Sequence, residues 1–410
     1  MLTAALANNP IRRLGRRESV ALLGMLMALN AVGIDAMVPA LPAIGASFHL
    51  VDANRLQLIV ITYMIGFGAG QLLWGPLADR FGRKHVLGWG VGLFAASAIA
   101  CTMAPTFALL IAGRVMMGAA AASTRVLVTA VVRDLFEGEE MARVMSLVFM
   151  VFMVVPVLAP SLGSAILLVG PWQSIFWALA GIAGLLLLWG ETRLPETLHP
   201  DFRRALDPRA ILEAVRAAVG DRLAVGYTLT ATALFGGLSA YVATIQQIVA
   251  DVFHAGPRLP LVFAAVAGPM ALAAWGNSAI IGRFGLRRVG HSALLLFLAL
   301  VLLHLAVAAS GHETLMLFVI LHGVTLMSFA FCSSNFSTLA MTNMGEIAGT
   351  ASSIQGFTST IGGALIGLLI GQAFDGTVLP FLIGLAGTGL IALGCVLVTE
   401  RGRLMAALDA

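Results

Sequence analysis

The chain has 410 residues, of which 59% are hydrophobic and only 11% are charged, with a formal net charge of +4. Soluble domains carry about 25% charged residues, so this composition excludes a soluble fold and indicates that the solvent is lipid. The basic residues are spread over short loops, which argues against nucleic-acid binding. Three isolated cysteines, Cys101, Cys332 and Cys395, predict neither a metal site nor a structural disulfide.

Twelve apolar segments have the roughly 20 residues that a helix needs to cross a bilayer. The first segment is too long for a cleavable signal peptide and lacks a small-residue cleavage site. We therefore predict an all-α integral membrane protein with twelve transmembrane helices. The predicted spans are residues 19–44, 55–78, 86–104, 107–131, 143–169, 173–192, 223–250, 259–281, 290–309, 314–339, 347–373 and 378–399.

The basic residues distinguish the two sides of the predicted membrane. All but four of the 24 Lys and Arg residues lie in loops on one side or in the tails. The exceptions are Arg55 and Arg258, at the edges of opposite loops, and Arg114 and Arg125, inside the fourth span. Because loops rich in Lys and Arg stay in the cytoplasm, both termini and the 193–222 loop are predicted to be cytoplasmic.

The 193–222 loop divides the chain into a six-span half at 1–192 and a second half at 223–410. The tripeptide Arg-Phe-Gly follows the second span at 80–82 and recurs after the eighth span at 283–285. The recurrence of this tripeptide after corresponding spans indicates a parallel internal repeat. A repeat of this kind places a substrate site between the halves, near the middle of the membrane.

Asp35 is the only charged side chain between Ser19 and Val51. A carboxylate surrounded by hydrocarbon is costly, so acids inside spans are rare and usually functional. We predict that Asp35 binds the coupling proton and contacts the substrate.

The second span ends in the sequence Gly75-Pro76-Leu77-Ala78-Asp79-Arg80-Phe81-Gly82-Arg83-Lys84. Gly75 would allow close helix contact, and Gly82 would allow a tight turn. Asp79 at the membrane edge would face a helix N-terminus or an arginine. Charge pairs of this kind can hold one conformation and break in another. The predicted gating residues are therefore Gly75, Asp79, Arg80, Gly82, Arg83 and Lys84; the alternative is an ordinary basic loop.

Arg114 and Arg125 share one face of the fourth span, because eleven residues make only about 20° more than three full turns. Arg114 either pairs with Asp35, directly or through water, or only bonds backbone carbonyls and braces the packing. Arg125 is either a second cation of the cavity or snorkels to the membrane edge. Two arginines against one acid favour neutral, zwitterionic or anionic substrates over cationic ones.

The fifth span contains Pro156, Pro160 and Gly163. A proline inside a helix removes a backbone hydrogen bond and bends the helix. The bend either hinges or seals a cavity, so that these residues take part in gating, or is a passive kink. Elsewhere, His304 and His322 lack the helical spacing of a metal pair, and no metal site is predicted.

These motifs resemble the major facilitator superfamily over residues 18–399. Residues 75–84 resemble its loop between helices 2 and 3. Residues 110–118 resemble the arginine motif of its drug exporters, with Met117 where Gln is usual. Residues 156–163 resemble the antiporter motif in the variant of bicyclomycin- and chloramphenicol-resistance exporters. The stretches 35–42, 170–176, 191–197 and 348–352 resemble further signatures of that group.

The resemblance implies a monomeric drug/proton antiporter of a bacterial inner membrane, driven by the proton gradient without a cofactor. Some relatives place a second acid two turns before Asp35; Met27 stands there, so Asp35 is expected to act alone. The helices that line the pore in the resembled fold add substrate contacts at Tyr63, Tyr241, Gln246 and Asn335. A proton-coupled importer on the same fold is the alternative. No catalytic, metal-binding or nucleotide-binding pattern in the sequence supports a membrane enzyme or a sensor.

Overall fold

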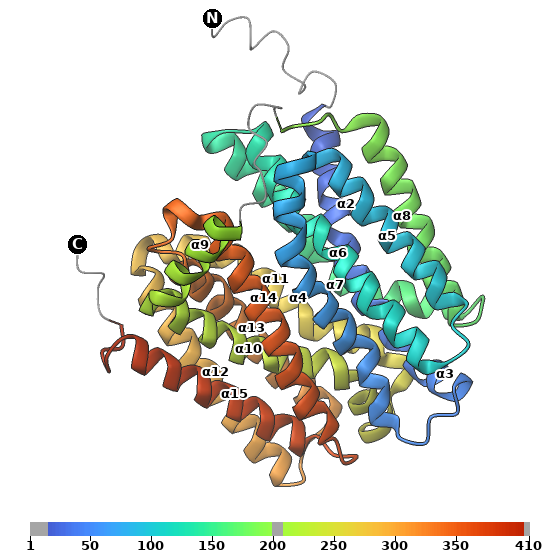
Figure 1. The fold of residues 1–410 in the computed structure, drawn as a ribbon. Helices are drawn as coiled ribbons and strands as arrows, with labels where there is room; N and C mark the ends of the chain where they lie inside the picture. Colours follow the sequence, from blue (N-terminus) through green and yellow to red (C-terminus); the bar gives the residue numbers. More distant parts are fainter. Residues whose placement is uncertain (1–14, 199–207, 406–410) are drawn as a thin grey trace, which may run out of the picture.

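The computed structural model describes residues 15–198 and 208–405 (Figure 1). The regular elements in this part of the chain are helices, and twelve of them are long and apolar enough to cross a membrane. The predicted all-α class and the number of spans are confirmed.

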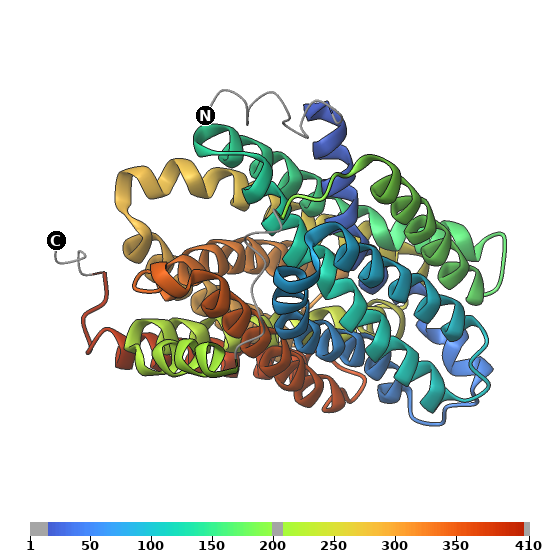
Figure 2. The same cartoon turned by 45° about the horizontal axis from the view of Figure 1, so that its top comes forward.

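The first six spans form one group, drawn blue to green in Figures 1 and 2. The first span is interrupted: the long helix ends at Asp35, and two short helices complete the crossing. The elements are α2 (Arg16–Asp35), η2 (Val38–Ala40), α3 (Leu41–Ser47), η3 (Ala53–Leu56), α4 (Gln57–Phe81), α5 (Arg83–Thr102), α6 (Phe107–Leu135), α7 (Gly138–Leu167) and α8 (Gln173–Arg193).

The last six spans form the second group, drawn yellow-green to red. We call α2–α8 the first half and α10–α15 the second half. The elements are α10 (Arg222–Gln247), η5 (Ile248–Val252), η6 (Gly256–Arg258), α11 (Leu259–Phe284), α12 (Leu286–Ala309), α13 (Leu315–Ala340), η7 (Gly345–Ile347), α14 (Ala348–Gln372) and α15 (Leu379–Thr399).

The sequence predicted a loop between the halves, but part of this segment is a helix. Residues 208–220 form the helix α9 (Pro208–Gly220), which packs against α10 and α14. Its apolar residues recur in the sequence with helical spacing, which is typical of a helix that lies on a surface. Because the segment is short and polar, it carries no transmembrane signal from which this helix could be predicted.

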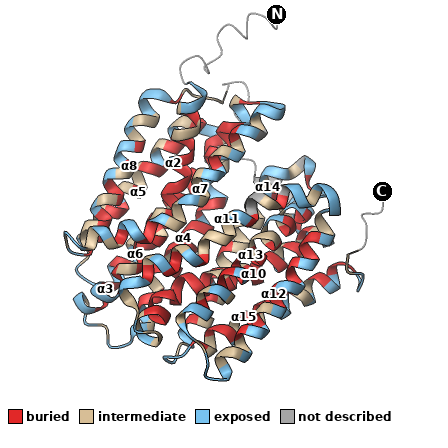
Figure 3. Ribbon diagram, turned by 180° about the vertical axis from the view of Figure 1, so that it is seen from behind, coloured by how far each residue is buried: buried red, intermediate tan, exposed pale blue. Residues whose placement is uncertain are grey.

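Successive spans alternate in direction, which defines two faces of the molecule. The face with the α4–α5 turn and the start of α10 is called the basic face. The face with η3, η5 and the α12–α13 loop is called the opposite face. Buried positions gather on the sides of the helices that face one another (Figure 3). Large apolar residues such as Leu185 and Leu369 are exposed, as expected for contact with lipid.

The internal repeat is visible in the turns on the basic face. Gly82 links α4 to α5 with a φ of +101°, and Gly285 links α11 to α12 with a φ of +79°. Residues with a side chain rarely adopt these backbone angles, so the glycine of each Arg-Phe-Gly tripeptide is required by its turn. The predicted tight turn at Gly82 is confirmed.

Glycines bring several helices into backbone contact. A Cβ on Gly66 would overlap the carbonyl oxygen of Val115, and one on Gly118 would overlap that of Tyr63, so α4 and α6 pack backbone to backbone. Gly363 and Gly367 likewise pack closely on α10. Small residues permit this close approach in membranes, where van der Waals packing drives helix association.

The close contact predicted for Gly75 is wrong. The nearest atom to a Cβ at this position would be Val126 Cγ1, 3.9 Å away, which is ordinary van der Waals contact. The side of α4 that meets α6 carries Gly66 and Gly70, and Gly75 is only half-buried beyond it.

Candidate transport site and gates

Asp35 lies at the end of α2, where the first span breaks into η2. Its side chain is 7% exposed, and it makes no hydrogen bond or ion pair with any residue that the structure describes. The hydroxyls of Tyr63, from the first half, and Tyr241, from the second half, lie within electrostatic reach of its carboxylate. Asp35 is therefore a buried acid between the two halves whose oxygens remain available to a proton or a ligand.

The proline-containing helix reaches the backbone next to Asp35. A Cβ on Gly163 of α7 would overlap the carbonyl oxygen of Ala36, so the two chains touch without an intervening side chain. Pro160 and Pro156 lie about one and two turns before this contact, respectively, inside α7. A change in the bend of α7 would therefore displace the backbone at the end of α2.

Arg114 does not form the direct ion pair with Asp35 that was one of the two expectations. Its Nη1 donates to the carbonyl of Gly33 at 2.9 Å, and its Nε donates to that of Ile59 at 2.9 Å. Its Cζ lies 4.5 Å from the centroid of the Tyr63 ring. The guanidinium is fully buried, so among the described residues it braces α2, α4 and α6 through carbonyls and an aromatic face.

Arg125 has a different environment from Arg114. Its side chain is exposed, whereas that of Arg114 is fully buried. No described side chain forms an ion pair or a hydrogen bond with its guanidinium. This cation is therefore available to a ligand.

The other predicted substrate contacts divide into two groups. Tyr63 and Tyr241 are buried near Asp35: the Tyr63 hydroxyl lies 3.3 Å from Asn30 Oδ1, whereas that of Tyr241 has no partner in the described chain. Gln246 is buried on α10. Asn335 is fully buried and donates to Asn277 Oδ1 at 3.0 Å, which gives it a packing contact between α13 and α11.

A cluster of neutral amides joins the two halves at the opposite face, and sequence reasoning did not single it out. Gln57 Nε2 donates to Gln247 Oε1 and to the carbonyl of Gly371, both at 2.8 Å. Gln247 Nε2 donates to Asn54 Oδ1 at 2.9 Å, and Gln372 Nε2 donates to the backbone carbonyl of Asn54 at 2.8 Å. We call Asn54, Gln57, Gln247 and Gln372 the amide clasp.

Replacing Gln57 with Ala should open the opposite face. The substitution removes the hydrogen bonds that Gln57 donates to Gln247 Oε1 and to the Gly371 carbonyl, and each lost bond costs about 1 kcal/mol. Labelling of Thr244→Cys by a membrane-impermeant maleimide, in a background without the three native cysteines, should become several-fold faster. The control is Asn343→Ala, at an exposed position of the basic face. Unchanged labelling in Gln57→Ala would contradict a gating role for the amide clasp.

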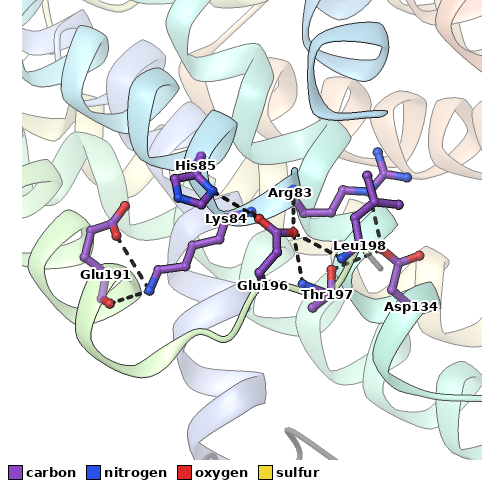
Figure 4. Close-up of polar contacts among 8 residues, drawn as sticks. All are labelled: Arg83, Lys84, His85, Asp134, Glu191, Glu196, Thr197 and Leu198. Atoms are coloured by element: carbon purple, nitrogen blue, oxygen red, sulfur yellow. Dashed lines mark hydrogen bonds and ion pairs between the residues drawn. The ribbon is translucent and has the colours of Figure 1, made fainter. Parts of the chain in front are cut away.

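At the basic face, a glutamate that follows α8 holds the signature turn. Glu196 Oε1 accepts from the Arg83 amide at 2.8 Å and Glu196 Oε2 from the Lys84 amide at 3.3 Å, at the start of α5 (Figure 4). Charged acceptors on a helix N-terminus stabilise the unpaired amides and the helix dipole. The sequence signal was present, because residues 191–197 match a family stretch, but nothing in the spacing assigned Glu196 a partner.

The predicted gating charges are joined within the first half. Arg83 Nη1 lies 2.6 Å from Asp79 Oδ1, and Arg83 Nε lies 3.3 Å from Asp134 Oδ2. Lys84 Nζ donates to the Glu191 carbonyl at 2.7 Å. Arg80 is exposed and stacks over Phe81, with its Cζ 5.2 Å from the ring centroid.

Replacing Glu196 with Gln should lower the free energy of unfolding by about 1–2 kcal/mol, because the charged acceptor of several backbone amides is lost. The thermal midpoint of the purified protein would report this loss. Glu139→Gln is the matched control, since Glu139 is exposed and has no described side-chain partner. Equal midpoints for the two variants would show that the cap contributes nothing.

Comparison with known proteins places these features in a family. The model of the Major Facilitator Superfamily matches residues 22–367. The uncharacterised MFS-type transporter YdgK of Bacillus subtilis (strain 168) is 33% identical over 357 residues, which cover 85% of this chain and 87% of the relative. The multidrug resistance protein MdtL of Escherichia coli O45:K1 (strain S88 / ExPEC) is 30% identical over 343 residues, covering 83% and 85%.

Solved structures show the same fold at lower identity. A D-xylose-proton symporter superposes with a TM-score of 0.74 at 16% identity, over 94% of this chain and 98% of that one. The human organic anion transporter MFSD10 (TETRAN) gives a TM-score of 0.65 at 19% identity, over 93% and 99%. With twelve spans, a signature turn on the basic face and a family match over most of its length, this chain belongs to the Major Facilitator Superfamily, a family of membrane transporters and not of enzymes.

Proposed function

We propose that this protein is a proton-coupled exporter of small amphipathic molecules, of the bicyclomycin- and chloramphenicol-resistance type. The observation that carries the proposal is the buried, unpartnered carboxyl of Asp35 between the halves, next to the backbone contact of the proline helix. The similarity to a multidrug resistance protein supports export of drug-like compounds. The setting would be a bacterial inner membrane, with both termini in the cytoplasm and a monomer as the working unit.

The mechanism alternates access to one site between the two six-helix halves, which residues 193–222 connect. With the amide clasp closed, substrate enters from the basic face and meets Asp35, Tyr63, Tyr241 and Arg125. Rocking of the halves then exposes the site to the opposite face, where a proton binds Asp35 and the substrate leaves. A ligand drives such a change only by binding the two states unequally, and one carboxyl shared by proton and substrate provides that difference.

The two polar clusters would act as gates in this cycle. The amide clasp holds the opposite face closed, and its neutral members can separate without leaving an unpaired charge in the membrane. The turn at residues 79–84, held by Glu196, keeps the basic end of the first half rigid while α7 bends at its prolines.

The direction of transport tests the proposal against an importer. In bacteria that lack their own efflux pumps, expression should lower the steady-state accumulation of a neutral or anionic drug, and a protonophore should restore it. Expression that raises accumulation would instead establish import. No change with neutral, anionic and cationic compounds alike would reject drug transport.

Arg125→Ala should change which substrates are carried. With the exposed cation removed, transport of an anionic drug should fall several-fold, whereas a cationic drug should be carried at least as well. Arg133→Ala, outside the predicted span on the same helix, is the control. Equal transport of both classes by wild type and Arg125→Ala would reject a substrate contact for this residue.

A further inference from the structure

A second group of titratable side chains is buried in the second half, away from Asp35. His304 of α12 and Glu313 of the α12–α13 loop meet with 2.6 Å between Nε2 and Oε1. Their side chains are only 1% and 7% exposed. The remaining polar atom of each, His304 Nδ1 and Glu313 Oε2, has no partner in the described chain. We call these two residues the His–Glu pair.

The short contact requires a proton between the two atoms, because a bare imidazole nitrogen and a carboxylate oxygen would repel each other. A neutral His304 that donates Nε2–H to an ionised Glu313 carries one negative charge. One further proton, on Nδ1 or on the carboxyl, makes the pair neutral overall. The pair is thus built to change by one charge on binding one proton.

Few charges surround the pair. The helices α13 and α15 contain no Asp, Glu, Lys or Arg, and α10, α11 and α12 carry theirs at the basic face, at Arg222, Arg283, Arg287 and Arg288. His312 is exposed in the same loop. The other loops of the opposite face carry His49, Asp52, Arg55, Asp251, His254, Arg258 and Asp375, and none of these residues forms a described ion pair with His304 or Glu313. No fixed cation among the described residues compensates Glu313, so a proton remains its available counter-charge.

A line of polar groups leads from the pair toward Asp35. The ring of His322 on α13 lies 6.3 Å from that of His304 and 4.7 Å from that of Tyr241, measured between centroids. His322 is fully buried, yet neither of its nitrogens has a described partner. The Tyr241 hydroxyl is also unpartnered and lies within electrostatic reach of Asp35. Buried polar groups left unsatisfied in this way are costly and call for an explanation.

We propose that His304 and Glu313 form a second proton-binding site, reached from the opposite face beside exposed His312, and that His322 and Tyr241 connect it to Asp35. The proton that the pair binds comes from solvent. It leaves His304 Nδ1 for His322 through a bridging water, because the ring spacing is too long for a direct bond, and the Tyr241 hydroxyl passes an equivalent proton toward Asp35. The link to transport rests on the proposed antiport, whereas proton binding by the pair does not.

Histidine-labelled protein, observed by NMR from about pH 5 to 8, tests proton binding directly. One imidazole signal, identified by its loss in His304→Gln, should titrate. Its midpoint should move in Glu313→Gln, remain in Asp35→Asn, and be unaffected by the control His312→Gln in the same loop. A His304 signal that neither titrates nor responds to Glu313→Gln would overturn the second site.

Counting protons tests the connection. On addition of substrate, His322→Phe, which keeps the ring shape, should release fewer protons per bound substrate than wild type while the His304 signal still titrates. Unchanged release would overturn the path through His322. If wild type releases no protons with any substrate, the antiport proposal fails, and titration of His304 would still establish the second site.

Discussion

Replacing Asp35 with Asn should abolish proton-driven efflux while leaving substrate binding measurable. The amide has nearly the same shape as the carboxyl but binds no proton at neutral pH, so substrate and proton can no longer exchange at one group. Efflux of a drug from energised cells should fall to the level of cells without the protein. Binding to the purified variant should persist, because Tyr63, Tyr241 and Arg125 remain.

The matched control is Asp375→Asn, in the exposed loop between α14 and α15, where the carboxylate only caps a turn at Thr377. This variant should transport like wild type. Efflux by Asp35→Asn at the wild-type rate would show that Asp35 does not couple protons to transport. The His–Glu pair would then be the next titratable group to test.

The second large effect is on stability. Gly66→Ala should destabilise the protein by about 1–3 kcal/mol, the typical cost of overpacking. The added methyl group would overlap the Val115 carbonyl, and a backbone atom cannot move aside as a flexible side chain can. The thermal midpoint in detergent should fall, and α4 and α6 should separate enough to disturb the Arg114 contacts between them.

Gly75→Ala on the same helix provides the control, because its nearest neighbour leaves room for a methyl group. Alanine is the better helix former by up to about 1 kcal/mol, so this variant should be neutral or slightly stabilised. A loss of stability in Gly75→Ala as large as in Gly66→Ala would show that the α4–α6 contact is not the cause.

The parts of the fold that the sequence predicted depend on local signals. Span positions follow from the length of apolar runs, and the turn at Gly82 follows from a glycine placed between basic residues. Such signals lie within a few turns of the chain, so no knowledge of packing is needed to read them.

The remainder depends on contacts between distant residues. The amide clasp joins Asn54 to Gln372, 318 positions apart, and single amides in a span cannot be told from ordinary packing groups. Glu313 stands in a short loop that appeared to be only a break between spans, yet its side chain folds back onto His304. Arg114 could have paired with Asp35, but its Nε and Nη1 donate instead to the carbonyls of Ile59 and Gly33.

The most direct test of the account is proton release from the purified, detergent-solubilised protein when substrate is added, compared between wild type and Asp35→Asn. We predict that a neutral or anionic drug releases protons from wild type, and that the release attributable to Asp35 is lost in the variant although the drug still binds. Drug binding to wild type without any proton release would contradict proton-coupled export and leave Asp35 a substrate contact or a structural residue.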